Sequence, residues 1–95
     1  MRFFSKVEDT FQIAGRGCVV VPAVPDPNLG WRIKLGMPLQ LRTPTGHFID
    51  TRIAGVEILC GPKVKDRIAF LLPTDIARQD VPAGTEIWLL ENAGG

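Results

Sequence analysis

Short runs in which apolar and polar residues alternate dominate the chain, and they predict β-strands. Phe11 and Ile13 alternate with polar or small neighbours, and Leu39 and Leu41 do the same further along; a period of two is typical of half-buried strands. Cys18–Val21 is instead a continuous apolar, β-branched run, as expected of a strand covered on both faces. Because no window of ten or more residues has a helical period, the pattern predicts an all-β protein.

Glycine-containing turns divide these runs. Gly15 and Gly17 flank Arg16 between two of the predicted strands, and glycine can adopt the positive φ that a tight hairpin turn requires. We therefore expect a hairpin over Phe11–Val21 with Arg16 at its tip. Thr43–Gly46 reads Thr-Pro-Thr-Gly, which fits a type I turn.

The segment Phe48–Leu59 reads as one long strand whose alternation changes phase in the middle. Ile49, Thr51 and Ile53 share one face before Gly55. After Gly55 the pattern predicts buried side chains at Val56 and Ile58 and an exposed side chain at Glu57. A phase change at a glycine indicates a β-bulge, which bends a strand.

The remaining pattern predicts short strands at 3–7, 31–36, 68–72 and 86–90, a charged connection at 63–67 and a single helical turn within 74–80. Many short strands separated by Gly and Pro favour a barrel or a sandwich. The predicted bulge and the glycine-rich corners favour the barrel. We therefore expect one domain over 1–95, a small closed antiparallel β-barrel of six to eight strands.

Composition narrows the possible functions only slightly. The 95 residues carry a net charge of +1, which gives no overall electrostatic argument for binding nucleic acid or a membrane. The sequence has neither a signal-peptide core nor an apolar run of membrane-spanning length, so we expect a cytoplasmic protein. Cys18 and Cys60 lack metal-ligand spacing and are expected to be buried thiols. The alternative is a disulfide between them, which requires the fold to bring the two residues together.

Four segments in order resemble the second domain of elongation factor Tu and related translational GTPases. They are VEDTFQIAGRGCVVV, LGMPLQLR, TRIAGVEIL and RIAFLLPTDIARQDVPAGTEIWL. The resemblance extends from Phe3 to Leu90 and implies a small antiparallel β-barrel. We expect no GTPase domain of that family, since no GxxxxGK[ST] phosphate loop occurs among the 95 residues. We therefore expect neither GTP binding nor GTP hydrolysis.

The resemblance also implies two candidate RNA contacts. Glu57 matches the glutamate of the family's Gly-Val-Glu segment, which lies near the terminal adenosine of transfer RNA, and Arg16 matches the arginine of its GRG turn. The sequence departs from the family after Glu57, where Ile58 and Leu59 follow and the nearest basic residue is Lys63. The alternatives are a solvated carboxylate or a surface ion pair for Glu57, and a solvated turn tip for Arg16.

Three further residues are weighed as functional. Trp31 and Trp88 are candidate partner contacts, because an exposed tryptophan anchors many protein interfaces; the alternative is packing within the barrel. His47 follows the predicted turn at Thr43–Gly46 and is expected to be exposed. With a single histidine and no paired thiol, we expect no metal, no cofactor and no catalysis.

Two hypotheses for function follow. The first is a non-catalytic protein-interaction module, linked to the translation machinery or acting as a mimic of the elongation factor's domain. The second is binding of transfer RNA or ribosomal RNA through a basic face that includes Arg16, Arg52, Lys63 and Lys65. A fragment without an independent task is a third possibility, and the sequence leaves the oligomeric state open.

Overall fold

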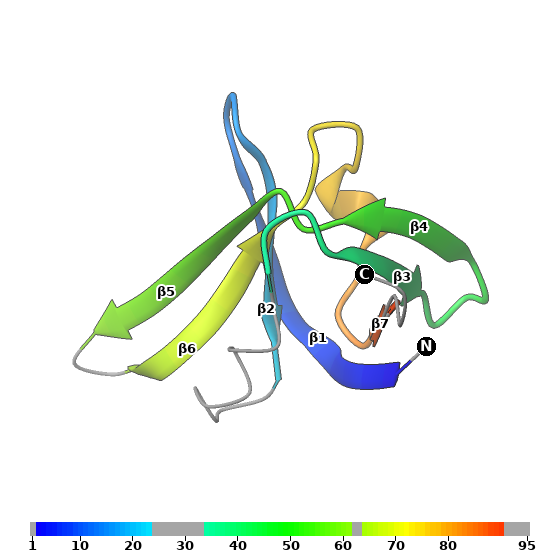
Figure 1. The fold of residues 1–95 in the computed structure, drawn as a ribbon, viewed down its shortest axis with the longest axis horizontal. Helices are drawn as coiled ribbons and strands as arrows, with labels where there is room; N and C mark the ends of the chain where they lie inside the picture. Colours follow the sequence, from blue (N-terminus) through cyan, green and yellow to red (C-terminus); the bar gives the residue numbers. More distant parts are fainter. Residues whose placement is uncertain (1, 24–33, 62–63, 91–95) are drawn as a thin grey trace.

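The fold is described from a computed structural model. It covers the backbone of residues 2–23, 34–61 and 64–90, and the side chains of these residues except 58–61 and 64–68. The elements are β1 (Arg2–Ile13), β2 (Gly17–Pro22), β3 (Pro38–Arg42), β4 (Phe48–Arg52), β5 (Gly55–Gly61), β6 (Val64–Leu71), the 3₁₀ turn η2 (Arg78–Asp80) and β7 (Glu86–Leu89) (Figure 1). The described residues contain no α-helix, which confirms the all-β prediction.

All seven strands belong to one antiparallel sheet, in the order β4-β3-β7-β1-β2-β6-β5. The long strand β1 joins its two halves. The first part of β1 pairs with β7, where Phe3 lies opposite Trp88, and its second part pairs with β2, where Thr10 lies opposite Val20. Figure 1 shows β5 and β6 spreading to one side of β1 and β2, and β3, β4 and β7 to the other.

The two outer strands, β4 and β5, do not pair with each other. The antiparallel sheet is confirmed, but these seven strands leave it open rather than closed into the predicted barrel. The chain passes from one half of the sheet to the other where β4 ends. Ile53 exchanges backbone bonds with Gly36 and Met37, whereas the Ala54 N–H donates to Leu71 O at 2.8 Å. The chain therefore leaves one half of the sheet and enters the other within two residues.

This corner corrects the prediction of one bulged strand over Phe48–Leu59. Ile53 is fully buried at the corner, and Ile49 and Thr51 share its side of β4 as predicted, both half-buried. Beyond the corner the prediction for Val56 is wrong, because this side chain is exposed on β5. Among the described strands, β5 pairs with β6 alone, so fewer neighbouring residues cover its side chains.

Three other predicted boundaries also change. The first expected strand and the first arm of the hairpin form a single strand, β1, with a register shift between Val7 and Asp9. The expected charged connection at 63–67 becomes the start of β6 from Val64 onwards. Residues 34–36 form a turn rather than a strand, closed by the Met37 N–H donating to Lys34 O.

The helical turn expected within 74–80 is reduced to the three residues of η2. The expected last strand is confirmed as β7, which ends at Leu89.

The core forms where the two halves of the sheet face each other. Its fully buried members include Phe70, Leu39 and Leu41, so the predicted alternation along β3 is confirmed. Every residue of β2 is buried, as predicted for a strand covered on both faces. Val20 belongs to the main core, while Val19 belongs to a second cluster on the opposite face of the sheet.

The predicted hairpin between β1 and β2 is also confirmed. Gly15 and Gly17 adopt φ values of +79° and +125°, and the Arg16 N–H donates to Ile13 O at 3.0 Å. Gly17 is required for a second reason: a Cβ at this position would lie 2.8 Å from Leu72 O. The hairpin thereby packs directly against the end of β6 and presents Arg16 at its tip.

Candidate functional site

The two candidate RNA contacts are bonded to each other. Arg16 Nη2 donates to Glu57 Oε1 at 2.8 Å, although the two residues are 41 positions apart in the sequence. The hairpin tip supplies the guanidinium and β5 supplies the carboxylate. Their side chains are 56% and 37% exposed, so the pair lies at the surface. Glu57 therefore forms the surface ion pair that was one of the alternatives to an RNA contact.

Trp88 belongs to a group of side chains on the outer face of β7, β3, β4 and the start of β1. Ile87 and Leu89 point into the core, so Trp88 points the opposite way, because neighbouring strand residues alternate between faces. Strand register places Phe3 and Gln40 opposite Trp88. The tryptophan therefore lies at the middle of three adjacent strands.

Arg42 connects the aromatic side chains of this face. Its guanidinium carbon lies 4.2 Å from the centroid of the Trp88 ring and 4.9 Å from that of Phe48, distances at which a cation is attracted to an aromatic ring. On the other side of Trp88, the ring of Phe3 makes an edge contact at 5.4 Å and 71°. We call the set Phe3, Arg42, Phe48 and Trp88 the outer aromatic face.

Side-chain hydrogen bonds hold this face in place. The Trp88 indole N–H donates to Glu86 Oε1 at 3.0 Å, and Arg42 Nε donates to Gln40 Oε1 at 2.9 Å. Gln40 in turn donates to Asp50 Oδ1 at 3.0 Å. The tryptophan and arginine are thus fixed by neighbours before any partner arrives, which reduces the entropy lost on binding.

Much of this apolar surface is open to solvent. Phe48 is 63% exposed and Phe3 is 45% exposed. Trp88 was predicted from the sequence as a contact residue, whereas Phe3, Arg42 and Phe48 were not. The available signal was the alternation itself, since Arg42 and Phe48 occupy the outward phase of their strands. Their grouping depends on pairing between strands distant in sequence, which alternation does not reveal.

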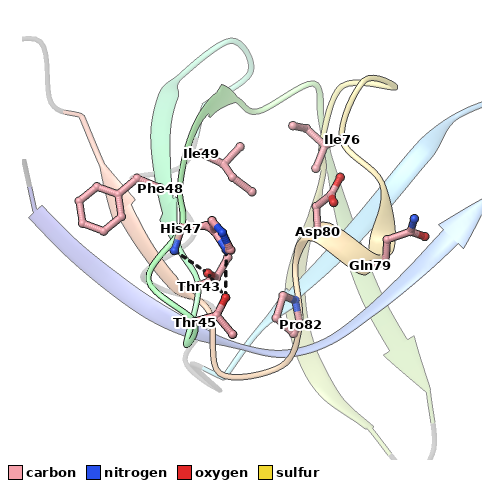
Figure 2. A pocket seen from close by; sticks show the side chains of 9 residues that line it. All are labelled: Thr43, Thr45, His47, Phe48, Ile49, Ile76, Gln79, Asp80 and Pro82. Atoms are coloured by element: carbon pink, nitrogen blue, oxygen red, sulfur yellow. Dashed lines mark hydrogen bonds between the residues drawn. The ribbon is translucent and has the colours of Figure 1, made fainter.

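A pocket of about 650 Å³ opens between the β3–β4 hairpin and the segment that contains η2 (Figure 2). His47 lies at its edge and is exposed, as predicted. His47 Nδ1 lies 3.0 Å from Thr45 Oγ1, and the backbone N–H of His47 donates to Thr43 Oγ1 at 2.9 Å. These contacts give the histidine a role in holding the turn.

Cys18 is a free, buried thiol, as expected. Burial raises the pKa of the Cys18 thiol, and the positive charge of Arg78 partly opposes this effect. Trp31 and Lys63 lie outside the described residues, and so do the side chains of Ile58, Cys60 and Lys65. The predictions for these side chains therefore remain predictions.

The part of the chain that the structure describes contains no group of three or more His, Cys, Asp or Glu placed to hold a metal ion. Among the same residues, no helix has the length and apolar character needed to cross a bilayer.

Comparison with known proteins returned no matching family model, no matching curated protein and no matching solved structure. The resemblance to the second domain of elongation factor Tu therefore remains a prediction from the sequence segments.

Proposed function

We propose that this protein is a non-catalytic protein-interaction module that binds its partner through the outer aromatic face. The observation that supports the proposal best is the stacking of Arg42 between Trp88 and Phe48 on an exposed sheet face. Tryptophan and arginine, with tyrosine, are enriched among the residues that dominate binding energy. Aromatic residues and arginine are likewise enriched at protein interfaces.

A link to the translation machinery is the second part of the proposal, and it rests on the four segments that resemble elongation factor Tu. In this reading the chain is a translation-factor-like β-domain in the cytoplasm that uses its surface to bind a translation protein or to imitate the factor's own domain. RNA binding through Arg16 and Glu57 is the weaker alternative. Their mutual ion pair at 2.8 Å offsets the charge that each side chain would offer to RNA.

Affinity capture from lysate of the source cells tests the proposal, with and without nuclease. We expect one protein in stoichiometric amount, retained after nuclease treatment and lost with Trp88→Ala. Phe3→Ser is a second variant of the same face that removes a more exposed ring. Val56→Ser is the matched control, because Val56 is an exposed apolar residue of β5 outside the outer aromatic face.

Two results would contradict the proposal. The first is retention of RNA without a stoichiometric protein, which would favour the RNA alternative and make Arg16→Ala and Glu57→Ala the next variants. The second is a protein partner whose retention is unchanged by both Trp88→Ala and Phe3→Ser. Thermal unfolding of each variant shows whether a loss of binding reflects a loss of folding.

A further inference from the structure

The outer strand β4 has backbone groups that point away from β3, the strand it pairs with among the described residues. The Thr43 N–H donates to His47 O at one end of the β3–β4 pair, and the Ile53 N–H donates to Met37 O at the other. Hydrogen-bonded pairs alternate along antiparallel strands, so Ile49 and Thr51 face β3. Phe48, Asp50 and Arg52 alternate with these two residues along β4. Their backbone N–H and C=O groups therefore point to the open edge.

The pocket of about 650 Å³ lies alongside the first half of this edge. Figure 2 shows Ile49 and Ile76 on opposite sides of the pocket, with Asp80 on the same side as Ile76 and the Phe48 ring turned away onto the outer face. Apolar side chains thus line both walls. Aliphatic walls beside unpaired strand backbone are the two features that strand addition uses: main-chain bonds give affinity and pockets for alternate side chains give specificity.

The charge of the lining selects between possible occupants. Asp80 is the only Asp, Glu, Lys or Arg among the described residues that line the pocket. One oxygen of this carboxylate accepts the Ala77 N–H at 3.2 Å, which fixes the side chain at the exposed wall. A lysine or arginine of an incoming chain would be attracted to Asp80, whereas an acidic side chain would be repelled.

We propose that an extended segment of a partner protein adds to β4 as a further strand. One apolar side chain of that segment enters the pocket between Ile49 and Ile76, and a basic side chain two positions away pairs with Asp80. Positions two apart share one face of a strand, so the segment has an apolar-x-basic pattern. The inference rests on the proposed function in taking the occupant to be a partner protein, and it specifies how that partner binds.

A synthetic peptide provides the probe: acetyl-Thr-Lys-Thr-Ile-Thr-Lys-Thr-amide. A lysine on each side of the isoleucine satisfies the pattern in either strand direction. We expect saturable shifts in the nuclear magnetic resonance spectrum of the full chain at the amides of β4 and of residues 76–80. Amide exchange should slow at Phe48, Asp50 and Arg52. It should change little at Ile49 and Thr51, which already bond to β3, and this alternation distinguishes strand addition from other binding near the pocket.

Two controls test the chemistry of the groove. A peptide with both lysines changed to glutamate should bind more weakly than the probe. Asp80→Asn keeps an oxygen for the Ala77 N–H but removes the charge, and should weaken the lysine peptide about two- to fivefold, as expected for an exposed ion pair. Absence of shifts at roughly 1 mM peptide, where even weak complexes form, or protection without the alternation, would overturn the proposal.

The two proposals can fail separately. If Trp88→Ala and Phe3→Ser abolish partner capture while the peptide leaves the β4 amides unchanged, the interaction module stands and strand addition is wrong. The opposite result is that the peptide protects Phe48, Asp50 and Arg52 while Trp88→Ala and Phe3→Ser still capture the partner. The groove beside β4 is then the binding site, and the outer aromatic face was wrongly proposed as the binding surface.

Discussion

Gly17→Ala tests whether the β1–β2 hairpin packs against β6 as described. Gly17 differs from Gly15 in two respects. Its φ of +125° lies outside the small left-handed region that L-residues enter, near +60°. An added Cβ would also lie 2.8 Å from Leu72 O, whereas the space around Gly15 is empty to 4 Å.

The structure sets the size of the expected effect. Holding an alanine at this φ costs on the order of 1–3 kcal/mol. Relief of the contact requires the Leu72 backbone to move, which strains the 2.8 Å bond from the Leu72 N–H to Cys18 O; such a bond contributes about 1 kcal/mol. We therefore expect Gly17→Ala to destabilise the fold by about 2–4 kcal/mol. Gly15→Ala places an alanine in left-handed backbone but creates no close contact, so it should lower the free energy of unfolding by only about 1–2 kcal/mol.

Thermal unfolding followed by circular dichroism measures both variants. For a domain of this size, each kcal/mol lowers Tm by about 4–8 °C, so Gly17→Ala should melt well below Gly15→Ala. Equal melting temperatures for the two variants would refute the close approach of the hairpin to Leu72. Urea unfolding gives the same comparison as free energies and shows whether the transition stays cooperative.

Three further predictions concern the ion pair, the buried thiol and the core. A double-mutant cycle on Arg16→Ala and Glu57→Ala should give a coupling of about 0.2–1 kcal/mol that falls with added salt; a coupling above about 2 kcal/mol would contradict a solvated pair. Because burial raises the pKa of Cys18 above its ordinary value of 9.0, its contribution to stability should be complete below that pH and decline as pH rises further. Urea unfolding at pH 8 and pH 10 measures this decline in the free energy of unfolding, and Cys18→Ala should make the decline smaller. An equal decline in wild type and Cys18→Ala would show that other groups cause it. Phe70→Ala should cost about 3–5 kcal/mol and Val56→Ala less than about 0.5 kcal/mol, and similar costs for the two would contradict the burial described.

The sequence pattern correctly predicted those elements whose conformation depends on residues close together in the sequence. Alternation placed Leu39 and Leu41 in the core because one face of β3 is buried. The two glycines of the hairpin were predictable because their positive φ is a property of the turn itself. These predictions needed no knowledge of which strands pair.

The failed predictions depend on contacts between distant segments. A bulge and a corner both change the phase of alternation, so the pattern at Gly55 did not distinguish them. The difference lies in the bonding partners of Ile53 and Ala54, which belong to different halves of the sheet. Val56 was predicted to be buried because its own strand reads as apolar, but its exposure follows from the position of β5 at the end of the strand order.

The candidate site shows the same division. Trp88 was selected because tryptophan is rare and binds well at interfaces. The arrangement of Phe3 and Arg42 around it depends on the pairing of β1, β7 and β3. The bond between Arg16 and Glu57 likewise requires the hairpin tip and β5 to meet. The sequence identified Trp88, Arg16 and Glu57 as candidates, but it did not show which side chains lie next to them in the fold.

Isothermal titration calorimetry of the captured partner with wild type and with Trp88→Ala shows whether the outer aromatic face is the binding surface. We expect Trp88→Ala to lose affinity about 30-fold or more, the range of a dominant interface residue, and Val56→Ser to bind about as tightly as wild type. Equal affinities for wild type and a folded Trp88→Ala variant would contradict the claim that the outer aromatic face binds the partner.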